Sequence, residues 1–154
     1  MTTTTPLVDP RVIALAHYAA RAVLENVLAR HGVTFQQSVT LRLAATADGP
    51  VERERIVDGV AGALKNDAAE AQAVIDQLIT AELLAPVEGA GVRITDAGRE
   101  LYTRTAGETA PFTARIYAGI PEEDLAVAGR VLGLITERAN AELNTLTQQT
   151  ALTK

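Results

Sequence analysis

The side chains able to carry chemistry in this sequence are few. Cys is absent, which excludes disulfides, thiolate nucleophiles and Cys-ligated metal ions, and His17 and His31 are the only histidines. The sequence shows no Gly-rich phosphate loop, no nucleophilic Ser paired with His and no close His pair with a carboxylate. We therefore expect a protein that is not an enzyme, with no cofactor and no metal site.

Polar side chains that could read or hold a nucleic acid are present instead. Gln72 and Gln77 could pair with adenine edges, or they are solvated residues of a helix surface. Arg53 and Arg55 could clamp phosphates, or they balance the acids beside them in the segment 52–55. Arg93 is the only cation in a short Gly-containing segment and carries the same two interpretations.

Length and composition indicate one folded domain. The chain has 154 residues, of which 47% are hydrophobic and 21% charged, as in ordinary globular proteins. We expect no apolar run near the roughly 18 to 20 residues of a membrane span. The start, MTTTTPLVDP, lacks the basic and apolar regions of a signal peptide, so we expect a cytoplasmic protein.

Charge is distributed unevenly along the chain. The net charge is −5, but residues 1–48 carry +1 and residues 106–154 carry −2. Residues 49–105 hold six basic and ten acidic residues, a net of −4. An acidic middle third opposes nucleic-acid binding, which draws most of its affinity from Lys and Arg.

Capping signals and apolar periodicity predict two helices in the first third. Asp9-Pro10 starts a helix of about 20 residues that ends at His31-Gly32. Thr34 and Gln37 form a capping box that opens a second helix, which runs to about Ala47.

The middle third predicts two short helices and a hairpin. After the turn at 48–50, one helix runs from about Val51 to 65–66, and a capping box of Asp67 and Glu70 opens another that ends near Glu82. The pattern of residues 83–95 then predicts two strands around a glycine turn at 89–91. Thr95 caps the helix that follows.

The last third predicts a long, partly apolar helix. Pro111 must kink or break the helix that starts after Thr95, and 112–118 continues it. The final helix opens at Gly119 with acids at 122–124, which either stabilise the helix dipole or form a carboxylate cluster. Its apolar residues follow near-heptad spacing: Leu125, Ala128, Leu132, Ile135, Ala139, Leu143 and Leu146. We expect the ends, 1–8 and 147–154, to be frayed.

The predicted order is mainly α with a small β-hairpin, a winged helix-turn-helix with N- and C-terminal dimerisation helices. The chain resembles the MarR (multiple-antibiotic-resistance regulator) family of bacterial transcription factors over about 140 residues. The matching segments are Gly32-Val-Thr-Phe-Gln-Gln37, Val74-Ile-Asp-Gln-Leu78 with Glu82-Leu-Leu84, Ile94-Thr-Asp-Ala-Gly-Arg-Glu-Leu101 and Ala118-Gly-Ile-Pro-Glu-Glu-Asp-Leu125. We expect a single domain, 1–154, with dimerisation helices at 9–31 and 96–146 and the winged helix-turn-helix at 34–95.

The resemblance implies a homodimer that binds a near-palindromic duplex, with 67–82 as the recognition helix in a major groove and 89–91 as the wing tip. The DNA-binding residues it implies are Ala69, Gln72, Ala73, Gln77, Arg93, Arg53 and Arg55. Compared with the family, the helix offers no outward Arg to read bases, and the wing is shortened around Arg93.

The family's members are often released from DNA by a small aromatic ligand, which implies an aromatic or anionic effector here. A structural role is the favoured alternative for each candidate effector contact. The candidates are His17, Tyr18, Arg21, Phe35, Arg115 and Tyr117. The sequence thus predicts a ligand-responsive dimeric DNA-binding regulator. The alternative is a winged-helix dimer that has lost operator binding and binds a protein or a small molecule.

Overall fold

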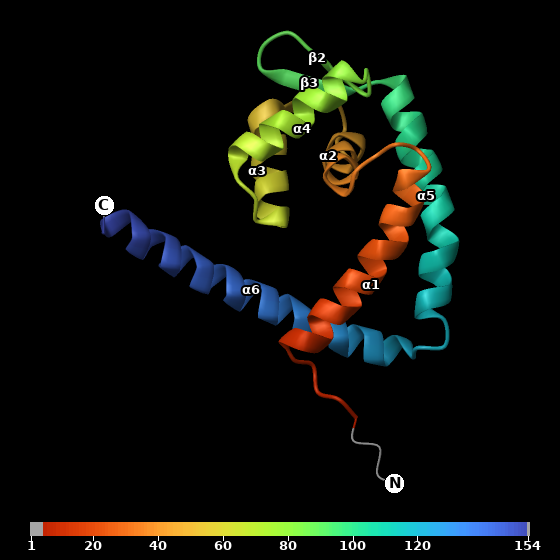
Figure 1. Cartoon of the computed structure of the whole chain (residues 1–154), viewed down its shortest axis with the longest axis vertical. Coiled ribbons are helices and arrows are strands. Elements are labelled where there is room, and N and C mark those ends of the chain that lie inside the picture. The colour runs from red at the N-terminus through yellow and green to blue at the C-terminus, as the bar shows by residue number, and fades with distance from the viewer. Residues whose placement is uncertain (1–4, 154) are drawn as a thin grey trace. The chain divides into compact units, whose positions relative to one another are not determined.

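The protein is mainly helical with a small sheet, as the sequence predicts. A computed structural model describes residues 5–153. Its elements, in chain order, are α1 (Pro10–Ala29), α2 (Phe35–Ala45), β1 (Val51–Glu52), α3 (Arg53–Leu64), α4 (Ala68–Thr80), β2 (Leu84–Pro86), β3 (Gly91–Ile94), α5 (Asp96–Tyr117) and α6 (Glu122–Leu152) (Figure 1). The chain divides into two compact units, one up to Thr113 and one from Ala114.

The predicted caps start the helices of the first unit. The Asp9 carboxylate accepts a hydrogen bond from the Val12 amide at 2.8 Å, and the Asp67 carboxylate accepts one from the Glu70 amide at 2.8 Å. Thr34 and Gln37 form both bonds of a capping box, each 3.1 Å long. Each cap satisfies amide groups that the first helical turn leaves without a partner.

A third strand is present where the sequence predicted the start of a helix. Val51–Glu52 pairs antiparallel with β3, which makes a three-stranded sheet in the order β1-β3-β2 instead of a two-stranded hairpin. α3 therefore begins at Arg53. A two-residue strand is too short to show the alternation by which strands are recognised, and its paired residues lie 39 and 41 positions further along the chain.

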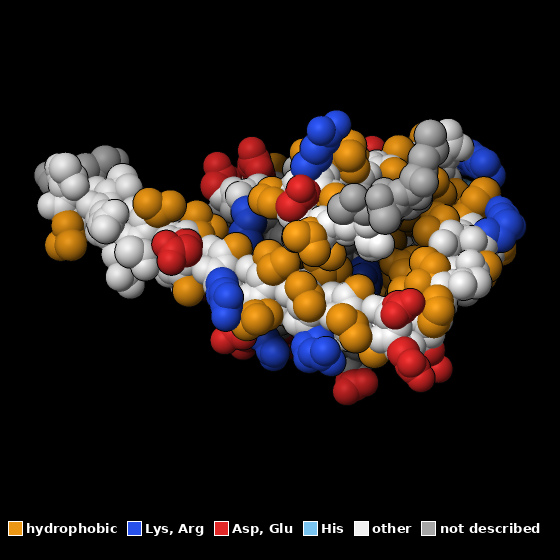
Figure 2. Space-filling view, turned by 90° about the horizontal axis from the view of Figure 1, so that it is seen from below, with side chains coloured by type: hydrophobic (Ala, Val, Ile, Leu, Met, Phe, Trp, Pro, Cys, Tyr) orange, Lys and Arg blue, Asp and Glu red, His pale blue; other side chains and the backbone are white. Residues whose placement is uncertain are grey.

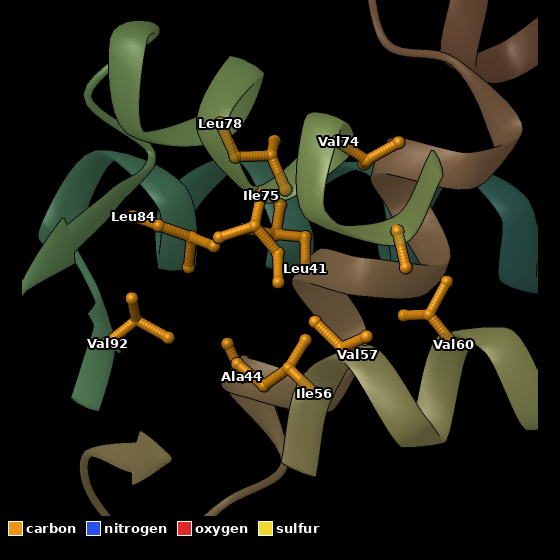
Figure 3. Packing of buried hydrophobic residues seen from close by; sticks show 11 residues of the cluster. Leu41, Ala44, Ile56, Val57, Val60, Val74, Ile75, Leu78, Leu84 and Val92 are labelled. Carbon is orange, nitrogen blue, oxygen red and sulfur yellow. The ribbon is translucent and has the colours of Figure 1, made fainter. Parts of the chain in front are cut away.

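The core of the first unit lies where α2, α3, α4 and the sheet meet (Figure 3). α4 contributes Ala71, Val74, Ile75 and Leu78, none of them more than 4% exposed. They belong to one buried cluster with residues of α2, α3 and the sheet, and Figure 3 shows Ile75 and Leu78 within it, so one side of α4 is fixed inward. The opposite side of α4 is therefore left to solvent or to a partner.

One prediction for the C-terminal half is wrong, and one is met in part. α5 is one helix from Asp96 to Tyr117 with Pro111 inside it, so 112–117 continues the helix as expected and there is no break at Pro111. A proline removes a single backbone hydrogen bond, which the bonds on either side can outweigh. The expected fraying at 147–152 is also absent, because α6 continues to Leu152. Residues 5–8 form no helix or strand, and the other expected frayed positions, 1–4 and 154, lie outside the described residues.

α1 differs from the expectation that no segment approaches the length and apolar character of a membrane span. It is long and apolar enough to pass a length-and-composition test for a membrane span, with a mean hydropathy of 1.3 in an 18-residue window. Only 11% of that window is buried within the structure. A helix that buries its apolar surface against protein passes the same test, so this feature does not by itself place α1 in a bilayer.

The corner between the sheet and α5 explains the motif at 94–101. The Thr95 hydroxyl donates to the Glu82 carbonyl at 2.7 Å and accepts from the Gly98 amide at 3.0 Å. A Cβ on Gly98 would overlap the Leu83 carbonyl oxygen and would lie 2.9 Å from Ile94 Cγ1. Glycine is therefore required here so that α5 can approach the sheet closely.

We expect Gly98→Ala to lower the free energy of unfolding by about 1 to 3 kcal/mol, because backbone must move to admit the methyl group. Gly107→Ala, in the same helix, is the matched control: nothing lies within 4 Å of its Cβ position. It should leave stability unchanged or raise it by up to about 1 kcal/mol. Chemical denaturation of both variants measures the difference. Equal stabilities would contradict the close-approach explanation.

Candidate nucleic-acid interface

α3 and α4 form the helix-turn-helix of the first unit. Lys65 ends α3 in the left-handed conformation, with φ of 56°, and Asp67 caps α4. Between them, the side-chain oxygen and nitrogen of Asn66 are buried without a hydrogen-bond partner among the described residues. The turn is thus short, and it fixes the start of α4 directly after α3.

The outer side of α4 carries the residues that the sequence placed there. Ala69, Ala73 and Gln77 are exposed, and Gln72 is half-buried. Ala73 and Gln77 also line an open shallow hollow together with Asp76, Thr80 and Ala81. The structure therefore brings the predicted α4 residues to one accessible surface.

Arg53 bridges α3 and α4. Its Nε donates to Gln72 Oε1 at 2.5 Å, and its Nη2 donates to Asp76 Oδ1 at 2.5 Å and to the Gln72 carbonyl at 3.3 Å. Its acidic partner is therefore Asp76, 23 residues away, and not the neighbouring Glu52 or Glu54. Arg53 cancels one negative charge on the outer side of α4 and fixes the side chain of Gln72.

A second polar link joins α2 to α4. Gln37 Oε1 accepts from the Thr34 amide in the capping box, and Gln37 Nε2 donates to Gln77 Oε1 at 3.1 Å. Sequence reasoning identified the capping box and Gln77 separately. The link between them joins residues 40 positions apart and becomes visible only when the helices are packed.

Arg55 and Arg93 are the exposed cations near this surface among the predicted DNA-binding residues. Arg55 forms no ion pair with any described residue and lines a hollow of about 660 Å³ with residues 47–52. Arg93 lies on β3 opposite Ala85, beside the 87–90 connection of the wing. The Arg53 amide donates to the Ala90 carbonyl at 2.9 Å, which attaches that connection to the start of α3.

The predicted effector residues are only partly brought together. The Arg21 guanidinium lies 4.3 Å from the centre of the Phe35 ring, and it forms an ion pair with Glu25 at 3.0 Å. The rings of His17 and Tyr18 meet edge to face at 5.9 Å, and both residues are exposed. The remaining two candidates, Arg115 and Tyr117, belong to the second unit.

Sequence reasoning missed two features of the first unit. A hollow of about 340 Å³ is lined by Ala22, Val23, Asn26, Val27, Arg30 and Phe112. His31 Nε2 lies 3.1 Å from Glu108 Oε2, which ties the end of α1 to α5. No spacing rule links residues 77 positions apart, so neither the hollow nor this contact has a signal in the sequence.

The second unit exposes apolar side chains along α6. No residue of this 31-residue helix is buried. Figure 2 shows hydrophobic side chains along the C-terminal part of α6. The large exposed hydrophobic residues of this helix are Val127, Val131, Leu132, Leu134, Ile135, Leu143, Leu146 and Leu152. Four of the seven residues of the predicted near-heptad row are in this set.

No protein-family model matches this sequence, and no curated protein matches it. Solved structures do match. CouR from Rhodococcus jostii RHA1, bound to p-coumaroyl-CoA, has a TM-score of 0.68 at 18% identity over 81% of this chain and 88% of its own. NadR in complex with 4-hydroxyphenylacetate has a TM-score of 0.68 at 17% identity over 84% and 95%. A MarR-family transcriptional regulator from Rhodococcus sp. RHA1 has a TM-score of 0.66 at 19% identity over 81% and 89%.

These likenesses, together with the order of elements, define the fold. The chain has the winged helix-turn-helix fold of the MarR-family transcriptional regulators. The fold predicted from the sequence is confirmed, and the residues that act on that fold must be argued from this chain's own surface.

Proposed function

We propose that this protein is a MarR-family, DNA-binding transcriptional regulator that inserts α4 into a major groove, and that it acts in the cytoplasm. The observation that carries the proposal is the arrangement around α4. Its apolar side is locked in the core, and its polar side is presented beside a wing that carries Arg93. This placement suits groove binding by the second helix of a helix-turn-helix. A regulator of this kind needs no catalytic group.

The net negative charge of residues 49–105 opposes DNA binding, and an ion pair on α4 offsets part of that charge locally. Asp76, the acid at the centre of the outer side of α4, is paired with Arg53. Glu70 lies in the first turn of α4, close to its capping residue Asp67. We propose that Arg55 and Arg93 supply the phosphate contacts, while Ala69 and Ala73 permit close approach to the bases and Gln72 and Gln77 read them.

We propose that the protein acts as a homodimer on a near-palindromic operator. The support is α6, which buries none of its own residues but presents a row of large apolar side chains. An isolated helix gains most of its stability from packing an apolar face. A second copy of the chain would cover this face. The dimer would then carry two copies of α4, as a near-palindromic operator with half-sites about one helical turn apart requires.

We propose further that a small aromatic anion regulates the protein through His17, Tyr18, Arg21, Phe35, Arg115 and Tyr117. The support is the Arg21 guanidinium stacked on Phe35, a cation beside an aromatic ring. The structure of CouR holds p-coumaroyl-CoA, and that of NadR holds 4-hydroxyphenylacetate. Calorimetric titration with 4-hydroxyphenylacetate as probe tests this, and binding that Arg21→Ala leaves unchanged would contradict the assignment.

The acidic charge of residues 49–105 favours a second candidate, a winged-helix dimer that has lost operator binding and binds a protein or a small molecule. The engagement of Arg53 by Gln72 and Asp76 supports it, because that guanidinium is then not available to phosphates. This candidate predicts no affinity for any duplex at low salt.

We expect fluorescence anisotropy with the duplex upstream of the protein's own gene to show saturable binding by two chains per duplex. Binding should resist random competitor and weaken steeply with salt. Arg93→Ala should weaken binding to all sequences alike and reduce the salt slope by about one for each wing. Gln72→Ala and Gln77→Ala should instead change sequence preference.

Three results of this experiment would contradict parts of the proposal. Equal affinity of wild type and the three variants would reject the contacts. A complex with one chain per duplex would reject the dimer. Absence of binding at low salt to this and to several unrelated promoters would favour the second candidate.

A further inference from the structure

The two glutamines on α4 are held in fixed orientations by the rest of the fold. A glutamine amide has an accepting oxygen and a donating amino group, and which one faces outward follows from its hydrogen-bond partners. In both Gln72 and Gln77 the oxygen is engaged by a donor within the protein. The amino groups have no acceptor among the described residues.

The orientation of Gln77 follows from a chain of bonds. The Thr34 amide can only donate, so Gln37 must turn its oxygen toward it, at 3.1 Å. Gln37 is then left with its amino group, which donates to Gln77 Oε1 at 3.1 Å. Gln77 therefore keeps its own amino group for a ligand. The capping box at the start of α2 thus sets the hydrogen-bonding character of an exposed residue on α4.

The orientation of Gln72 follows from Arg53. A guanidinium has donors only, so the Gln72 side chain must offer its oxygen to Arg53 Nε. That oxygen retains a second lone pair, but an amino group that approached it would come close to the guanidinium, which also donates and is positively charged. Both glutamines therefore present donors to whatever binds α4.

We infer that α4 selects the guanine edge, and that Gln37 and Arg53 are positioning residues that set this preference. Guanine shows two adjacent acceptors, N7 and O6, in the major groove, whereas adenine places an amino donor beside N7. A glutamine that pairs with adenine must turn both its oxygen and its amino group toward the base, and here each oxygen is turned toward a donor within the protein. This replaces the adenine pairing expected from the sequence, and it rests on the proposed DNA-binding function.

Gln37→Glu tests the inference because it reverses the orientation at one position. A glutamate still caps α2, since its carboxylate accepts from the Thr34 amide as in the common form of the capping box. Its other oxygen can only accept, so Gln77 must turn its amino group inward and its oxygen outward. Gln36→Glu is the matched control: it adds the same charge at the adjacent, exposed position, and Gln36 has no side-chain bond to α4.

The experiment is selection of binding sites from a random duplex pool by the wild-type, Gln77→Ala, Gln37→Glu and Gln36→Glu full-length proteins. Gln77→Ala identifies the base position that Gln77 reads. We expect wild type and Gln36→Glu to prefer guanine there by roughly fivefold or more. Gln37→Glu should change that preference to adenine or cytosine, which carry amino groups, at otherwise unchanged positions.

A fourth variant keeps the test decisive. If thermal melting shows that Gln37→Glu does not fold, Gln37→Met removes the donor, frees the Gln77 amide to rotate and should abolish the guanine preference. Selection of adenine by the wild type, or an unaltered preference in a folded Gln37 variant, would overturn the inference and leave DNA binding intact. Failure of the wild type to enrich any duplex at low salt would overturn the proposed function and this inference together.

Discussion

The burial of one side of α4 is the constraint on which the rest of the site depends. Ala71 and Ile75 are fully buried and Leu78 is 1% exposed, in the cluster that α4 shares with α2, α3 and the sheet. Figure 3 shows Ile75 and Leu78 in this cluster. Removing a large side chain from such a position costs about 2 to 5 kcal/mol, a large part of the stability of a domain of this size. α4 therefore cannot rotate about its axis. The identity of its outward residues, and thus any base it reads, is decided by the core.

Hydrogen bonds from neighbouring helices then orient the glutamine side chains of α4. Arg53 and Gln37 come from different helices, yet each donates to a glutamine on α4. Hydrogen bonds at partly exposed sites contribute only about 0.5 to 1.5 kcal/mol each, so they do not hold the fold together. Their effect is on orientation. They determine whether α4 presents amide oxygens or amide amino groups, which is the property that a base edge distinguishes.

The sequence predicted those parts of the structure that depend on local signals. The caps at Asp9, Thr34 and Asp67 and the Thr95 corner are set by residues three positions apart, so each was recognisable. Contacts between distant segments carried no such signal. Pairing of β1 with β3 and the bridge from Arg53 to Asp76 arise from packing, and the sequence therefore placed the α4 glutamines without their partners.

α6 is longer than the apolar periodicity of its sequence predicts. The Thr-rich end at 147–153 lacks apolar periodicity, yet it continues the helix to Leu152. Hydroxyls of Thr147, Thr150 and Thr153 donate to carbonyls four residues earlier, at 2.8 to 3.0 Å. Such bonds satisfy the hydroxyl of a Thr within a helix. Apolar periodicity indicates which helix residues are buried, and no residue at this end of α6 is buried within the chain.

Nuclear magnetic resonance of the side-chain amides tests the central claim most directly, because it observes the amino groups of Gln72, Gln77 and Gln37 in one spectrum. A selected duplex should shift the amino resonances of Gln72 and Gln77, which face outward, and leave that of Gln37, already bonded to Gln77, close to its position in the free protein. If a tightly bound duplex leaves the Gln72 and Gln77 amino resonances unmoved, α4 is not the surface that reads the DNA.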